Sequence, residues 1–324
     1  MDTYIVIIII ICSTAALVAL LLFAIALLSE KLAFGTRCDK NPFLKYFTAE
    51  DFNLSAQPVT LAKGLKGFIY SKDDIPQKDK LIIFCHGMGP GHIAYTTEIA
   101  YFCNFGFPVL AVDSRGCNFS EGKNLKGMYS GVQTAISAID FANEKGYKDI
   151  NLVGHSWGAY SALCASARRK VNKVVAISAP NAPSVTMAEG AVNMGAMPRP
   201  LVAIMRPFWW LVNFFKYGAR GNSSAAKCAK RNGTPTLMIH GDKDRVVTLK
   251  KSAFNRAKGQ HITKLVAEGK VHNPYNTENA EIQLAVLSEK LKKNEYADIM
   301  QFDFKAATEE DEEVMQKILN FIEG

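Results

Sequence analysis

Largely apolar runs of four or five residues alternate with amphipathic stretches through most of the chain. The runs cover residues 81–85, 108–112, 150–153, 173–177 and 236–239. Continuous apolar runs of this length predict strands that are covered on both faces of a sheet. In residues 131–145, apolar side chains recur every three or four positions, which predicts a helix. Strands that alternate with helices predict an α/β fold with a mostly parallel sheet and helices on both faces.

One long interval between predicted strands has no strand pattern of its own. Residues 178–233 separate two of the runs, whereas connections in α/β folds usually take about 2–6 residues. The interval is rich in methionine and aromatic residues, among them Phe208, Trp209, Trp210, Phe214 and Phe215. We expect residues 179–233 to form a cap insertion over an active site. The alternative is a pair of accessory helices that pack on the domain.

The N-terminus has a different pattern. Residues 4–28 carry no charged side chain, and at about 1.5 Å per residue they are long enough to cross a bilayer core of roughly 30 Å. A cleaved signal peptide usually has a basic start and only about 7–15 apolar residues, but here the only charge before the run is Asp2. We expect an uncleaved transmembrane anchor over 4–28, a juxtamembrane connector over 29–58 and the α/β domain over 59–324. Cleavage near the anchor's end is the alternative.

The distribution of charge predicts an orientation in the membrane. The chain has 38 Lys and Arg against 30 Asp and Glu, a formal net charge of +8. No basic residue precedes the anchor, and the first ones after it are Lys31, Arg37, Lys40 and Lys45. The positive-inside rule then places the C-terminal domain in the cytoplasm. No Lys/Arg-rich block is interleaved with aromatics, which argues against nucleic-acid binding. The seven cysteines include no C-x-x-C pair, so no zinc site is expected.

A serine lies between two glycines where a predicted strand gives way to a predicted helix. The segment is Gly154, His155, Ser156, Trp157 and Gly158, the pattern G-x-S-x-G. The glycines let the strand and helix approach closely, and the sharp turn projects the serine hydroxyl out of the backbone. This pattern predicts a nucleophile at Ser156. Because so short a pattern also occurs by chance, other strand ends must supply a base, an acid and an oxyanion hole.

A glycine-containing loop follows the first predicted strand of the alternating region. Its residues are His86, Gly87, Met88 and Gly89. Glycine lets the backbone fold back so that the N–H of Met88 points at a substrate oxygen. Together with the N–H of Trp157, this group would form an oxyanion hole.

An acid and a base follow two later predicted strands. Asp244 comes after the run 236–239, and His272 comes after a further short apolar stretch. Asp242 lies in the same turn as Asp244 and is a rival for the acid. His261 is a rival for the base, but it precedes its strand and so falls at the wrong end of the sheet.

These motifs, in this order, resemble those of the α/β-hydrolase superfamily, especially the branch related to monoacylglycerol lipases and serine aminopeptidases. The resemblance covers residues 59 to about 291 and leaves the predicted anchor outside it. It implies an α/β-hydrolase fold in which Ser156 is the nucleophile, Asp244 the acid and His272 the base. It also implies that the two backbone donors form the oxyanion hole. The residues that support the site are then His86, Gly87, Gly89, Gly154 and Gly158.

A further segment fits the resemblance. Residues 113–120 look like the family's D-x-R-G-x-G-x-S loop, with Asn118 in place of the second glycine. Asparagine tolerates a left-handed backbone better than most residues, so the loop is expected to keep its shape.

The predicted function is that of a serine hydrolase acting on carboxylic esters or thioesters through an acyl-enzyme intermediate. The anchor and the apolar cap favour a lipid-like acyl substrate, and the cap is a second candidate for membrane contact. This chemistry requires no metal, nucleotide or flavin, so no cofactor is expected. A serine peptidase, an acyltransferase and a non-enzymatic binding scaffold are the alternatives.

Overall fold

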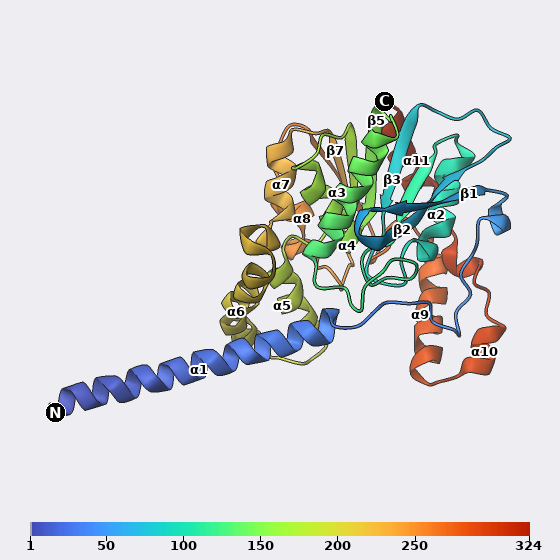
Figure 1. Ribbon diagram of the computed structural model, residues 1–324. Helices are drawn as coiled ribbons and strands as arrows, with labels where there is room; N and C mark the ends of the chain where they lie inside the picture. Colours follow the sequence, from blue (N-terminus) through green and yellow to red (C-terminus); the bar gives the residue numbers. More distant parts are fainter. Residues whose placement is uncertain (1) are drawn as a thin grey trace.

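An eight-stranded sheet forms the centre of the protein, for which a computed structural model describes residues 2–324 (Figure 1). The strands lie in the order β1-β2-β4-β3-β5-β6-β7-β8. β2 is antiparallel to its neighbours β1 and β4, and the other neighbouring strands are parallel. Their bounds are β1 Ser55–Leu61, β2 Leu65–Ser71, β3 Lys80–Cys85, β4 Val109–Val112, β5 Asp149–His155, β6 Lys173–Ile177, β7 Thr236–Gly241 and β8 Ile262–Ala267.

Helices cover both faces of this sheet (Figure 1). In β3, Leu81 and Ile83 pack on one face with α3 and α4, whereas Ile82 and Phe84 pack on the other with α2 and α11. Burial on both sides explains the continuous apolar run. The helices are α1 Thr3–Phe34, α2 Thr96–Asn104, α3 Tyr129–Glu144, α4 Trp157–Ser166, α5 Pro183–Asn193, α6 Arg199–Tyr217, α7 Ala225–Asn232, α8 Ala253–Arg256, α9 Glu278–Lys292, α10 Tyr296–Met300 and α11 Glu312–Glu323.

The predicted mostly parallel sheet with helices on both faces is confirmed, and the five apolar runs lie in β3, β4, β5, β6 and β7. The sheet begins earlier than expected, because β1 starts at Ser55 and not near residue 59. Most of the side chains of β1 are exposed or half-buried, so no apolar run marks this strand in the sequence.

The interval between β6 and β7 is helical and holds α5, α6 and α7 (Figure 1). The last turns of α1 pack against this helical insertion, which we call the cap after its predicted role. Buried side chains from both parts meet there: Ala26, Ala188, Val202, Met205, Trp209 and Val212. Trp209 Nε1 donates a hydrogen bond to Ser29 Oγ at 2.7 Å, and Lys216 Nζ lies 3.2 Å from a carboxylate oxygen of Glu30. Side-chain contacts therefore hold the cap against the end of α1, although the two parts are far apart in the sequence.

The first two-thirds of α1 project away from the domain with their apolar side chains exposed (Figure 1). Within residues 2–324, α1 is the helix long and apolar enough to cross a membrane, with a mean hydropathy of 3.2 over its most apolar window. It continues to Phe34, beyond the expected end of the anchor at residue 28.

The loop after β4 keeps the backbone expected for residues 113–120. Asn118 has φ 34°, in the left-handed region. Asp113 accepts hydrogen bonds from the backbone N–H of His92 at 2.8 Å and of Phe119 at 3.1 Å. Its carboxylate also lies 2.7 Å from His92 Nδ1, and both side chains are fully buried. The loop is thus tied to the segment that follows the predicted oxyanion loop.

A close approach between α4 and β3 gives the first prediction. A Cβ on Gly158 would lie 1.8 Å from the carbonyl oxygen of Cys85, so Gly158→Ala should destabilise the protein by about 3 kcal/mol or more. Gly190 in α5 has no atom within 4 Å of such a Cβ, so Gly190→Ala should be neutral or stabilising by about 0.5–1 kcal/mol. Thermal denaturation of both purified variants checks the contrast. Equal melting temperatures for the two would contradict the packing argument.

Candidate active site

Ser156 occupies a strained turn between β5 and α4. Its backbone has φ 53° and ψ −118°, which a residue with a side chain rarely adopts. The turn is held by its N–H, which donates to the carbonyl oxygen of Ile177 at 2.8 Å. A Cβ on Gly154 would lie 2.6 Å from the backbone of Gly158, so both glycines of the motif are required by contact. This tight turn places Ser156 just beyond the carboxyl end of β5.

The structure brings Ser156, His272 and Asp244 together in one hydrogen-bonded line. His272 Nε2 lies 3.0 Å from Ser156 Oγ, and His272 Nδ1 lies 2.8 Å from Asp244 Oδ2. The other carboxylate oxygen of Asp244 accepts from the backbone N–H groups of Val246 and Val247 at 2.8 and 2.9 Å. The carboxylate accepts a hydrogen bond from Nδ1, so the proton of the neutral ring stays on Nδ1. Nε2 is then unprotonated and can accept the proton of the serine hydroxyl.

Asp244 is buried but remains suited to the charged form. Burial alone would raise the pKa of its carboxyl group. The hydrogen bond and charge of His272, with the hydrogen bond from Val247, outweigh burial and lower that pKa below its ordinary value. The carboxylate can therefore stabilise a positive imidazole at neutral pH.

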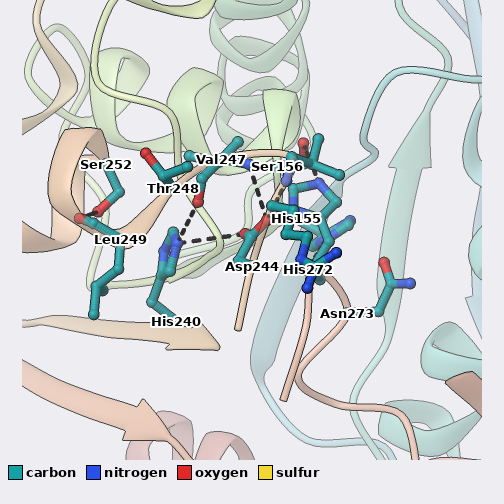
Figure 2. Close-up of polar contacts among 12 residues, drawn as sticks. His155, Ser156, His240, Asp244, Val247, Thr248, Leu249, Ser252, His272 and Asn273 are labelled. Atoms are coloured by element: carbon teal, nitrogen blue, oxygen red, sulfur yellow. Dashed lines mark hydrogen bonds and ion pairs between the residues drawn. The ribbon is translucent and has the colours of Figure 1, made fainter. Parts of the chain in front are cut away.

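Neither rival residue contacts this line. Asp242 accepts from the N–H of Gly269 at 2.7 Å, and its side chain stays partly exposed. His261 Nε2 donates to the carbonyl oxygen of Ala229 at 2.9 Å. A different histidine supports Asp244: His240 Nε2 donates to the carbonyl oxygen of Val247 at 2.8 Å and lies 3.4 Å from the carboxylate (Figure 2).

The loop after β3 is fixed by His86. Its Nε2 accepts from the N–H of Ser114 at 2.8 Å, so Nδ1 carries the proton and donates to the carbonyl oxygen of Gly87 at 2.6 Å. β3 and β5 are paired in parallel with Cys85 beside Gly154, so Met88 and Trp157 follow neighbouring strand ends. Trp157 is the first residue of α4, where the N–H groups have no acceptor within the helix. Their role as oxyanion donors stays a prediction.

A second polar chain, which the sequence did not indicate, connects this loop to His272 (Figure 2 shows His155 beside His272). The N–H of Gly87 donates to Tyr95 Oη at 3.0 Å, and Tyr95 Oη lies 2.9 Å from His155 Nδ1. His155 Nε2 lies 3.0 Å from the carbonyl oxygen of His272. The carbonyl can only accept, so the proton is on Nε2 and Tyr95 must donate to Nδ1.

Burial keeps His155 neutral. Desolvation, reinforced by the neighbouring His272, lowers the pKa of His155 to about 3. The ring is therefore one fixed tautomer at any pH near neutrality, and it orients the backbone of His272 without titrating. The sequence pattern does not indicate Tyr95, because this residue lies at the end of a short 3₁₀ turn, His92–Tyr95, and not at a strand end. Within residues 2–324, no group of three His, Cys, Asp or Glu side chains is arranged to hold a metal ion.

Comparisons with known proteins agree on the fold. The family described as alpha/beta hydrolase fold matches residues 80–197, whereas no curated protein matches the sequence significantly. An esterase from Pyrococcus furiosus is similar in structure with a TM-score of 0.57 at 21% identity, over 81% of this chain and 97% of that one. An esterase/lipase from an uncultured bacterium has a TM-score of 0.51 at 16% identity, over 70% and 78%. The α/β hydrolase GrgF from Penicillium sp. sh18 has 0.51 at 18%, over 74% and 98%.

The protein therefore has the α/β-hydrolase fold. Esterases are among the solved structures that share its architecture.

The second prediction concerns Tyr95. Tyr95→Phe leaves the N–H of Gly87 and Nδ1 of His155 unpaired, so it should slow the labelling of Ser156 by a fluorophosphonate about 10- to 100-fold. Tyr101→Phe is the matched control, because the Tyr101 hydroxyl donates to Glu312 at 2.8 Å, away from the site. Its labelling rate should stay near that of the wild type. Equal labelling rates for the two variants would show that Tyr95 does not contribute to the reactivity of Ser156.

Proposed function

We propose that this protein is a serine hydrolase that cleaves carboxylic esters or thioesters, with Ser156 as nucleophile, His272 as base and Asp244 as acid. The observation that carries the proposal is the line of hydrogen bonds from Ser156 Oγ through His272 to Asp244, at 3.0 and 2.8 Å. The strained backbone of Ser156 supports it, because such strain is characteristic of sites that hold a nucleophile exposed at a strand end.

The proposed reaction uses only groups of this chain and water. His272 Nε2 takes the proton of Ser156 as its oxygen attacks the acyl carbon, and Asp244 stabilises the imidazolium. The backbone N–H groups of Met88 and Trp157 bind the oxyanion. His272 then gives its proton to the leaving alcohol or thiol. In the second half, His272 takes a proton from water, the hydroxide attacks the acyl-enzyme, and the proton returns to Ser156 as the acid leaves.

The proposed substrate is a lipid-like acyl ester or thioester. The esterases among the structural neighbours support ester cleavage as the reaction class. Large apolar side chains remain exposed on the cap helix α6, namely Leu201, Ile204, Trp210, Phe214 and Phe215. An amphiphilic substrate would meet this surface first if the cap lies against a membrane.

The membrane attachment is also a proposal: α1 is a single-pass anchor, and the domain faces the cytoplasm. The length, hydropathy and exposure of α1, together with the basic residues after it, support this arrangement. Trp209 does not take part in lipid contact, because it is fully buried against the end of α1. Trp210 and Phe215 of the same helix are exposed, and the ring of Phe215 contacts that of Phe23 in α1 edge-on.

The third prediction tests the triad. Ser156→Ala and His272→Ala should each lower kcat for p-nitrophenyl acyl esters by several orders of magnitude, because the three residues act as a unit. Asp244→Asn should be severely impaired, since the amide favours the wrong imidazole tautomer. The matched controls Asp242→Asn and His261→Ala should keep most of the activity. If Asp242→Asn were the more damaging change, the acid would be misassigned.

A substrate panel separates this function from its alternatives. Acyl esters, acyl thioesters, N-terminal peptide amides and an added acceptor alcohol can be compared on one preparation. Turnover of peptides alone would make the protein a peptidase, and acyl transfer without net hydrolysis would make it an acyltransferase. A protein that neither turns over any of these substrates nor labels with a fluorophosphonate would be a binding scaffold.

The fourth prediction tests the anchor. Membranes washed with carbonate should retain the full-length protein. Protease added to intact cells should leave the domain whole, whereas permeabilised cells should lose it. Digestion from outside would reverse the orientation, and a mature chain that starts near residue 27 would identify a cleaved signal peptide.

A further inference from the structure

A groove runs between the cap and the segment that follows β7. Its volume is about 700 Å³, and residues from α5, from the start of α6 and from the 248–256 segment line it. A second hollow of about 220 Å³ adjoins it and shares four of the same lining residues. Together they form one continuous groove, which we call the cap groove. No residue of the Ser156, His272 and Asp244 line is in its lining.

The rim of the cap groove is strongly basic. Five cationic side chains line it: Arg199, Arg206, Lys250, Lys251 and Arg256. Its acidic lining residue is Glu189, which is buried and accepts a hydrogen bond from the hydroxyl of Thr248. Among residues 2–324, none of the five cations forms an ion pair with a carboxylate. Positive charges gathered in a concave site repel one another and attract an anion.

The floor of the cap groove is apolar and continues into the contact with α1. Val185, Val192 and Ala203 line the smaller hollow, along with Ala188 and Val202. Ala188 and Val202 also belong to the buried cluster that packs on Ala26 near the end of α1. Ala188 and Val202 therefore connect the floor of the cap groove with the end of the proposed anchor.

We propose that the cap groove binds the headgroup of an anionic phospholipid from the membrane that α1 spans. The phosphate would lie among Arg199, Lys251 and Arg256, and the first part of an acyl chain would lie on the apolar floor. Basic pockets at the cytoplasmic boundary of a membrane recognise lipid headgroups by this combination. The position beside α1 favours a membrane lipid over a soluble phosphate. This inference rests on the anchor in the proposed function but not on the hydrolase chemistry.

A lipid bound in the cap groove would contact both the loop after β7 and the cap helix α6. Thr248 and Lys250 follow Asp244 on the same loop, and Val246 and Val247 of that loop hold the carboxylate. Arg199 and Arg206 belong to the cap helix α6. A bound lipid would therefore link the cap to the segment that carries Asp244.

The experiment uses the full-length protein in nanodiscs of phosphatidylcholine that contain a small fraction of a photoactivatable phosphatidylglycerol. The same photoactivatable chain on phosphatidylcholine is the neutral probe. Crosslinks from phosphatidylglycerol should map to α5, α6 and the 248–256 segment and should exceed those from the neutral probe about tenfold. The double variant Lys251→Glu with Arg256→Glu should reduce them to the level of the neutral probe. The milder variant Arg199→Gln should reduce them in part.

The matched control makes the same change of charge elsewhere. Lys145 and Lys148 are exposed and lie before β5, at the opposite end of this strand from Ser156. Lys145→Glu with Lys148→Glu should leave the crosslinks unchanged. An equal loss of crosslinks in both double variants would show that net charge alone attracts the lipid. It would contradict specific binding in the cap groove. Displacement of the phosphatidylglycerol by millimolar inorganic phosphate would identify a soluble phosphate ligand and would also overturn the proposal.

Two readouts on the same samples keep this test separate from the proposed function. Fluorophosphonate labelling of Ser156 should persist in the groove variants, which shows that they are folded. Lipid crosslinks without any labelling in the wild type would count against the hydrolase alone. Loss of the protein from carbonate-washed membranes would count against the anchor, and with it against a membrane lipid as the ligand.

Discussion

The contact between α4 and β3 is the constraint on which the site depends. With hydrogen as its side chain, Gly158 brings the helix against the carbonyl oxygen of Cys85, and Gly154 brings β5 against the same turn. Only at this distance does the chain reverse sharply enough to hold Ser156 with a positive φ. The turn then positions Ser156 for His272 and starts α4 with its first N–H groups beside the serine. A larger side chain at Gly158 would move Ser156 and the N-terminus of α4 together.

Polar groups around the site form two chains that meet at His272. One runs from Asp244 through the ring of His272 to Ser156, and hydrogen bonds stabilise the negative charge of the Asp244 carboxylate. The other runs from Gly87 through Tyr95 and His155 to the backbone of His272, and it is neutral throughout. In the proposed reaction, the ring of His272 would exchange protons while its backbone stays held by His155. A buried neutral histidine suits this role, because its hydrogen bonds do not change with pH.

The sequence was most informative where both faces of an element are covered or where a motif is local. The apolar run of β3 and the G-x-S-x-G pattern depend on neighbouring residues, so each could be recognised in place. The order of Ser156, Asp244 and His272 along the chain indicated which strand ends would meet. Tyr95 could not be found in this way, because its contacts depend on how the segment after β3 folds back. Trp209 and Trp210 are adjacent in sequence, and only the docking of α1 decides that the first is buried and the second exposed.

The attachment of α1 to α6 limits how the cap can move. A lid that swings as one rigid unit must either separate Trp209 from Ser29 and Lys216 from Glu30 or carry the end of α1 with it. A helix that spans a bilayer adjusts its tilt to the thickness of the hydrocarbon layer. In a membrane, a movement of α6 relative to the sheet would then be coupled to the tilt of α1, and bilayer thickness would bear on the position of this helix.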